Sequence, residues 1–143
     1  PAAGMVALMQ PTFLQWNGAD GLYENRLGED VRPENNRYRE MLDADVPLAF
    51  GSDKMPPGPL YGMGFAIDSP YESQRLTVDE ALTAYTRGAA YAEFQEDEKG
   101  VLEPDRLGDA VVLDTDPYEH PDSFDEIGVE LTVLGGDVVY DRR

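Results

Sequence analysis

The sequence predicts an α/β fold that begins with two buried parallel strands and ends in a β-rich segment. Residues 4–9 and 46–50 are continuous apolar runs, which are typical of strands covered on both faces. A long polar loop and a helical segment separate these runs, and parallel strands need a crossover of this kind. Near the end, two strand-like segments flank Gly135-Gly136, which is a strong hairpin signal.

The crossover between the two apolar runs contains a predicted helix. Pro33 suits the first turn of a helix, so we expect the helix to begin there. Tyr38, Met41 and Leu42 follow the i, i+3, i+4 spacing of a buried helical stripe. The sequence "DADVP" then ends the helix before the second strand.

The segment after the second strand is ambiguous until residue 77. Residues 60–68 could form a short helix or a turn, because Gly62 and Gly64 weaken any regular element. A firmer helix is predicted over residues 77–94, where Glu80 follows Thr77 by three residues as in a capping box. The apolar stripe of this helix consists of Ala81, Leu82, Tyr85, Ala89 and Ala92.

The final third changes character and is predicted to be β-rich. Residues 110–113 form a strand between two turns, and the glycine hairpin follows. We therefore place a boundary near residue 98, which separates residues 1–97 from residues 98–143.

Composition narrows the class of protein. The chain has 143 residues and no cysteine, so disulfides are excluded and a metal would have to use His, Asp or Glu ligands. Its apolar runs fall far short of the roughly 20 residues of a membrane span. We expect a cytoplasmic protein with no membrane partner. Because the chain begins at Pro1 and not at methionine, it reads as part of something longer.

The charge is strongly acidic and spread along the chain. The net charge is −18, which argues against nucleic acid as a partner. Lys54 and Lys99 are the only lysines among 11 basic residues. An acidic, lysine-poor surface is typical of a halophilic cytoplasm, where salt screens the self-repulsion. The alternative is that this charge concerns solubility only.

Candidate functional residues follow the two predicted strands. In parallel barrels the catalytic and binding residues lie at the carboxyl ends of the strands. Gln10 and Asp53 occupy such positions. A carboxylate there can bind a metal or transfer protons. The alternative is that Ser52 and Asp53 only stabilise a tight turn. Trp16 and Arg26 lie in the loop after the first strand and either face a substrate or pack their own loop.

Three other motifs give little evidence for a function. Asp114 and Asp116 lack the further oxygen ligands and the spaced glycine of an EF-hand, so a solvated turn explains them. "GPLYGMG" lacks the context and spacing of a dinucleotide fingerprint. The single histidine, His120, lies in a polar turn and is expected at the surface.

The order of four segments resembles the carboxyl end of the amidohydrolase superfamily. These are "VALMQPTF", "VPLAFGSD", the run from Leu76 to Pro117 and "TVLGGDVVYD". The similarity is strongest to the YtcJ-like branch, which includes N-substituted formamide deformylases and AepA-like exoenzyme regulatory proteins. It covers nearly all of the chain. It implies that residues 1–97 are the C-terminal portion of a (β/α)8 TIM barrel, with strands 7 and 8, and that residues 98–143 are part of a small composite β-sandwich.

The resemblance also implies a chemistry. Asp53 would contact a divalent metal, zinc by expectation, and move a proton during hydrolysis of a carbon–nitrogen, amide-type bond in a small molecule. The other ligands of that family, several histidines and a lysine, have no counterpart here, so the chain alone should be inactive. Phe13 replaces a histidine found in some relatives, and Lys54 replaces a tryptophan, so the substrate does not carry over.

Two consequences of the resemblance remain open. The alternative to an enzyme is a non-catalytic regulatory or binding module that keeps the fold without the site. Two barrel strands cut from eight leave unpaired edges, so we expect the excised chain to self-associate or its first 70 or so residues to rearrange.

Overall fold

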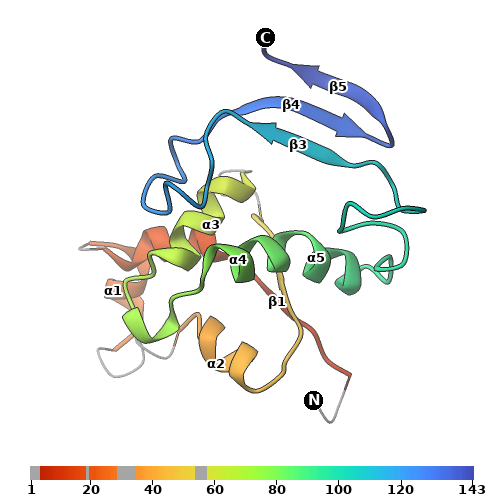
Figure 1. Cartoon of the computed structure of the whole chain (residues 1–143). Coiled ribbons are helices and arrows are strands. Elements are labelled where there is room, and N and C mark those ends of the chain that lie inside the picture. Colours follow the sequence, from red (N-terminus) through yellow and green to blue (C-terminus); the bar gives the residue numbers. More distant parts are fainter. Residues whose placement is uncertain (1–3, 19, 29–34, 54–57) are drawn as a thin grey trace.

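The computed structural model describes residues 4–18, 20–28, 35–53 and 58–143. It contains two separate sheets (Figure 1). The first is parallel and consists of β1 (Ala7–Met9) and β2 (Leu48–Phe50). The second is antiparallel, with β3 (Ala110–Leu113), β4 (Val129–Leu134) and β5 (Asp137–Asp141) in that order. The predicted α/β character is thus confirmed at the level of the elements.

The parallel pair has the predicted direction but uneven burial. Ala7 pairs with Leu48 and Met9 pairs with Phe50, so both strands end at the same edge. All three residues of β2 are buried, whereas Leu8 in the middle of β1 is 59% exposed. The prediction of burial on both faces is therefore correct for β2 and wrong for β1. Both strands are edges of this two-stranded sheet, and the helices described below pack against β2 and cover β1 less.

Short helices occupy the connection between β1 and β2. A 3-10 helix, η1 (Pro11–Asn17), follows β1 directly, and α1 (Leu22–Arg26) comes next. The crossover helix α2 (Tyr38–Asp43) begins later than predicted. Pro33 lies outside the described residues, and Asn36 has a φ of 59°, which interrupts any helix that starts before it.

Residues 59–67 form a helix and not a turn. This helix, α3 (Pro59–Ile67), starts with a proline in its first turn. Gly62 is required there because a Cβ at this position would collide with the Tyr85 hydroxyl. A short 3-10 helix, η3 (Glu72–Gln74), leads to the next segment.

The predicted helix over residues 77–94 is divided into two. Its capping box is confirmed, since the Glu80 N–H donates to the Thr77 side chain and the Thr77 N–H donates back to Glu80. Thr86, with φ −111° and ψ −83°, separates α4 (Val78–Tyr85) from α5 (Arg87–Ala92). The second part ends two residues earlier than predicted. After the break, Gly88 lies so close to β2 that a Cβ there would collide with the Leu48 carbonyl oxygen.

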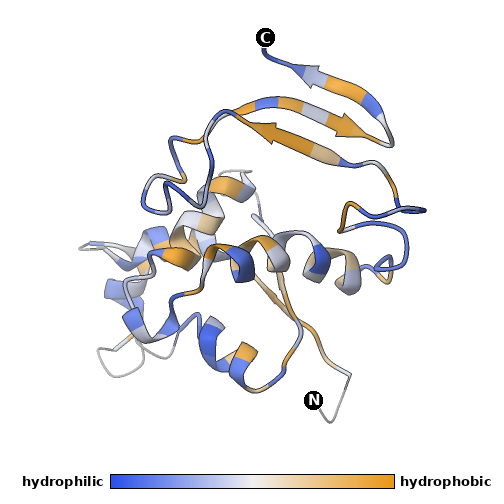
Figure 2. Ribbon diagram, in the orientation of Figure 1, coloured by the Kyte–Doolittle hydropathy of each residue, from blue (hydrophilic) through white to orange (hydrophobic). Residues whose placement is uncertain are grey.

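The strands of the second sheet lie where the sequence predicts them. Gly135 and Gly136, with φ values of 59° and 90°, form the turn between β4 and β5. This sheet exposes much of its apolar surface, which Figure 2 shows as orange strands at the top of the molecule. Its most exposed apolar side chains are Val111, Leu134, Val138 and Val139.

One core lies between the parallel pair and the helices. It includes Tyr38, Phe50, Met63 and Ala81. Phe124 and Ile127, from the loop before β4, belong to the same core. The boundary near residue 98 stays a prediction. Across the described residues, no helix is long and apolar enough to cross a membrane.

Candidate functional site

The carboxyl ends of β1 and β2 meet at one edge of the parallel pair. The Gly51 N–H donates to the Met9 carbonyl oxygen at 3.0 Å, which continues the pairing past the end of β2. Gln10 directly follows β1 and Asp53 lies three residues after the end of β2, so the structure brings the segments that carry them to the same edge. This is the arrangement that the sequence predicts for a site at strand ends.

Asp53 is exposed and has an unusual backbone. Its φ is 44°, which lies in the left-handed region that aspartate adopts more readily than most residues with a Cβ. Asp20, Asp45 and Asp105 share this conformation, so it fixes the shape of the loop without by itself indicating a function. The exposed carboxylate is free to meet a ligand or a metal at this edge.

Three aromatic rings pack edge-to-face around the end of β2. The Phe50 ring packs edge-on against Tyr38, with centroids 5.2 Å apart, and against Tyr85, with centroids 5.4 Å apart. The Tyr38 hydroxyl donates to the Asn36 side chain at 3.0 Å. These contacts give the strand a rigid end directly before the Gly51–Asp53 loop.

The Tyr85 hydroxyl is buried beside this loop. Burial raises the pKa of Tyr85 to about 12, and the neighbouring Ser52 side chain opposes that shift. Tyr85 is therefore neutral at pH 7. The hydroxyl has no hydrogen-bond partner within bonding geometry.

Thr12 connects the two strand ends. It lies in η1 and is fully buried, and its hydroxyl donates to the Ser52 carbonyl oxygen at 3.4 Å. The loop after β1 is thus attached to the loop that carries Asp53.

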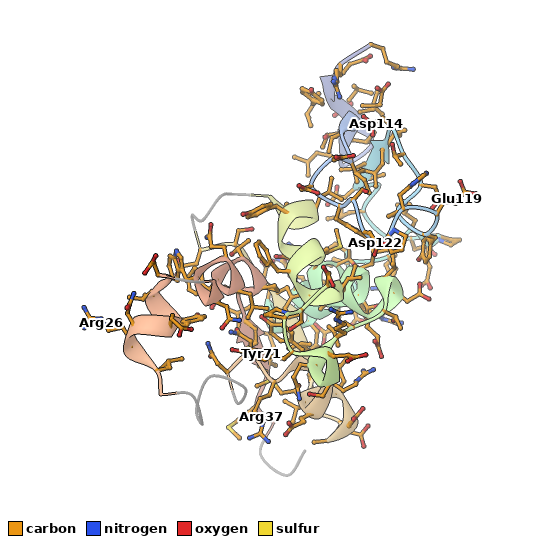
Figure 3. All side chains as sticks on the ribbon, turned by 90° about the vertical axis from the view of Figure 1, so that its left-hand side faces the viewer. Arg26, Arg37, Tyr71, Asp114, Glu119 and Asp122 are labelled. Atoms are coloured by element: carbon orange, nitrogen blue, oxygen red, sulfur yellow. The ribbon has the colours of Figure 1, made fainter. Side chains whose placement is uncertain are left out.

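The other predicted site residues are placed differently. Gln10 is half-buried at the start of η1 and makes no side-chain cap. Trp16 stacks on Phe13 with centroids 4.8 Å apart and meets Tyr23 edge-on, so it packs its own loop. Arg26 ends α1 on the outer side of the molecule and points away from the rest of the chain (Figure 3). The structure therefore groups Gln10 with Asp53 and leaves Arg26 apart.

Metal ligands are sparse in the part of the chain that the structure describes. It contains no group of three or more His, Cys, Asp or Glu side chains that could hold a metal. His120 is exposed in a loop. Asp114 and Asp116 accept hydrogen bonds from the backbone N–H groups of Gly128 and Tyr118, which agrees with a role in turns. A metal held by Asp53 would need further ligands from outside these residues.

Sequence reasoning missed Thr12 and Tyr85 as neighbours of the site. Thr12 stands two residues after Gln10, and this proximity to a strand end was an available signal. Tyr85 was assigned to the apolar stripe of a helix, because nothing in the sequence distinguishes a core tyrosine from one that faces a loop.

Comparisons with known proteins identify the family of this chain. Residues 1–140 match the model of the amidohydrolase family. An imidazolonepropionase from Porphyromonas gingivalis is 39% identical over 115 residues, which are 77% of this chain and 26% of the relative. The chain thus spans about a quarter of the length of that curated relative.

Two solved structures share the fold. A triazine hydrolase variant has a TM-score of 0.65 at 24% identity and covers 98% of this chain and 32% of its own length. The guanine deaminase of E. coli has a TM-score of 0.65 at 17% identity and covers 96% of this chain and 35% of its own length. With the family match over nearly the whole chain, these findings show that the chain belongs to the amidohydrolase family.

Proposed function

We propose that this chain is part of a metal-dependent amidohydrolase that hydrolyses a carbon–nitrogen, non-peptide bond in a small amide-type substrate. The observation that carries this proposal is the place of Asp53, directly after the second of two parallel strands in a chain of the amidohydrolase family. The names of the similar proteins, which include a deaminase and a hydrolase, support the same class of reaction.

Asp53 has the chemistry that this role needs. Its carboxylate is exposed at the strand ends and would hold one position of a divalent metal, for which zinc is the proposed identity. When bound, such a metal lowers the pKa of water and polarises the scissile carbonyl. Asp53 would accept the proton of the attacking water and return it to the leaving nitrogen. Gln10 lines the same edge, whereas Trp16 and Arg26 are weaker candidates for substrate contact.

The finer assignments belong to the same proposal. β1 and β2 would be strands 7 and 8 of a TIM barrel, and β3–β5 would be part of a β-sandwich. Within the family, the order of motifs favours the YtcJ-like branch. Because the described residues hold no complete metal group, the chain alone should be inactive and the remaining ligands should lie elsewhere in a longer protein.

A non-catalytic regulatory or binding module is the second candidate. The same sparseness of metal ligands in the described ranges favours it. The size of the native polypeptide separates the two candidates. An antibody against this chain should detect a product longer than a complete barrel of about 250 residues in source cells. A native product near 15.8 kDa would instead favour the module.

The catalytic role of Asp53 has its own test. In the full-length protein, Asp53→Asn should abolish hydrolysis while the thermal unfolding midpoint stays near that of the wild type, because the side chain is exposed and close in shape. A screen of amide-type substrates with purified, zinc-loaded protein supplies the assay. Near-normal turnover by the Asn variant would remove Asp53 from the mechanism.

The remaining proposals concern the location of the protein, its partners and its self-association. We propose a cytoplasmic, salt-adapted protein that binds no nucleic acid, on the strength of its net charge of −18. The exposed valines of β3 and β5 favour self-association of the excised chain. Gel filtration of the excised chain would reveal this as a species larger than a monomer.

A further inference from the structure

Two buried hydroxyl groups lie next to the loop that carries Asp53. One belongs to Thr12 of η1, which is fully buried. The other belongs to Tyr85, at the end of α4, and has no hydrogen-bond partner. Neither residue is assigned a role in the proposed reaction.

We propose that Thr12 and Tyr85 are positioning residues that hold the Gly51–Asp53 loop and so fix the direction of the Asp53 carboxylate. This inference rests on the proposed function for the importance of Asp53. The contacts that carry it concern the loop itself and are independent of any metal.

Thr12 acts on the backbone of Asp53 itself. Its hydroxyl donates to the Ser52 carbonyl oxygen, which belongs to the peptide unit joining Ser52 to Asp53. The orientation of this peptide unit, together with the φ of 44° at Asp53, sets where the carboxylate points. An anchor at the preceding carbonyl helps to keep this loop conformation in place.

Tyr85 supports the loop from the side of α4. Its hydroxyl occupies the space where Gly62 would carry a Cβ, and the methyl group of Thr12 is 3.4 Å from the same point. The two hydroxyl-bearing residues therefore converge on Gly62, beneath the loop. This convergence explains the glycine in "GPLYGMG" without any nucleotide.

Tyr85 acts through its ring and not through its hydroxyl. The ring packs edge-on against Phe50, the last residue of β2, with centroids 5.4 Å apart. The hydroxyl has no hydrogen-bond partner, so it holds no group of the loop. Tyr85 therefore fixes the start of the Gly51–Asp53 loop, while Thr12 restrains the Ser52 carbonyl group.

Four variants of the full-length protein test the proposal. Thr12→Val removes the hydroxyl and keeps the shape, whereas Thr12→Ser keeps the hydroxyl and serves as the matched control. Tyr85→Leu removes the ring that packs on Phe50, whereas Tyr85→Phe keeps the ring and serves as its control. Hydrogen exchange of the amides of residues 51–53 reports the order of the loop, titration with Zn²⁺ reports the metal affinity, and thermal unfolding reports stability.

We expect Thr12→Val to speed exchange in the loop selectively and to weaken Zn²⁺ binding about 10–100-fold. Thr12→Ser should keep both properties close to those of the wild type. Tyr85→Leu should speed exchange in the loop more than elsewhere, because it removes the ring that packs on Phe50. Tyr85→Phe should leave the loop unchanged while stability stays equal or rises, because the lost hydroxyl has no partner. Unchanged loop exchange in Thr12→Val and Tyr85→Leu, or exchange raised equally along the whole chain, would overturn the proposal.

Different results would contradict the proposed function. A wild-type protein that binds no Zn²⁺, or an Asp53→Asn variant with wild-type Zn²⁺ affinity, would remove the metal role of Asp53. Loop exchange in the Thr12 and Tyr85 variants would still decide whether these residues hold the loop.

Discussion

Both sheets of the molecule contain apolar strands, but the fold buries these strands to very different extents. In β2, Leu48 is 6% exposed, whereas Val138 and Val139 in β5 are each 58% exposed. β2 is covered by α2, α4 and α5, which come from the sequence on either side of it (Figure 1). No described segment gives β5 such cover. An apolar run therefore predicts which strands would be stabilised by burial. Whether such a strand is buried depends on other segments of the chain that pack against it.

The sharpest way to test this comparison uses the same substitution in both sheets. Leu48→Ala in β2 should lower the free energy of unfolding by about 2–5 kcal/mol, because it leaves a cavity in a packed core. Leu134→Ala in β4, where the leucine is 60% exposed, should change it by less than about 0.5 kcal/mol. Urea unfolding of the two variants of this chain measures both values.

The same two substitutions in the full-length protein test whether another segment packs against the second sheet. If a segment outside this chain packs against the second sheet, Leu134→Ala should become costly there while the cost of Leu48→Ala stays the same. Equal costs for both leucines already in the isolated chain would break the comparison, because the second sheet would then be buried in some assembly of the chain.

A second prediction concerns the close approach of α5 to β2. Gly88→Ala should lower the free energy of unfolding by about 1–3 kcal/mol, because its Cβ would collide with the Leu48 carbonyl oxygen and neither backbone can easily move. Gly18→Ala is the matched control, since a Cβ there meets nothing within 4 Å. Chemical denaturation compares them. A harmless Gly88→Ala would show that α5 packs loosely and that β2 is less well covered than the structure indicates.

The smallest effect concerns the charge that anchors α4 to α2. Burial alone would raise the pKa of Glu80, but hydrogen bonds from Arg39 at 2.6 Å and from Thr77 lower the pKa overall. Its charge therefore stabilises the fold at neutral pH, and this contribution is lost as the pH falls through the lowered pKa. Glu80→Gln should cost about 0.3–1 kcal/mol at pH 7 and nothing at a pH well below the ordinary value of about 4.3.

An exposed ion pair provides the control for that experiment. Asp68 pairs with Arg75 at 2.8 Å, with the Asp68 side chain 70% exposed, so Asp68→Asn should have little effect at any pH. Thermal unfolding from pH 3 to pH 7 compares both variants. A Glu80→Gln cost that persists at pH 3 would show that the helix contact depends on shape and not on charge.

Local signals account for the parts of the fold that the sequence predicts well. The capping box at Thr77 and the Gly135-Gly136 turn depend on a few adjacent residues, so they can be recognised in the sequence. The break at Thr86 and the exposure of Leu8 depend on what lies across the fold, so no local pattern reveals them. The same holds for the late start of α2, which follows the left-handed Asn36.

The candidate site also contains residues that a sequence rule identifies and residues that depend on distant contacts. Gln10 and Asp53 could be named because the ends of parallel strands meet, which is a rule of topology. Trp16 and Arg26 were chosen for their residue type within a loop, and the direction of a loop side chain depends on packing that the sequence does not encode locally. Thr12 and Tyr85 were missed for the same reason, since the contacts of Thr12 with Ser52 and of Tyr85 with Phe50 join segments far apart in the chain.

Phe124 and Ile127 set the order in which this chain can fold during synthesis. Both are buried in the core beside α3, and the Cβ of Phe124 lies 3.3 Å from the point where Gly64 would carry its own. The helices around β2 therefore remain incompletely covered until residues 124–127 have left the ribosome. Because contacts between such distant residues form slowly, the segment up to α5 should bind chaperones that recognise apolar surface until Phe124 and Ile127 reach it.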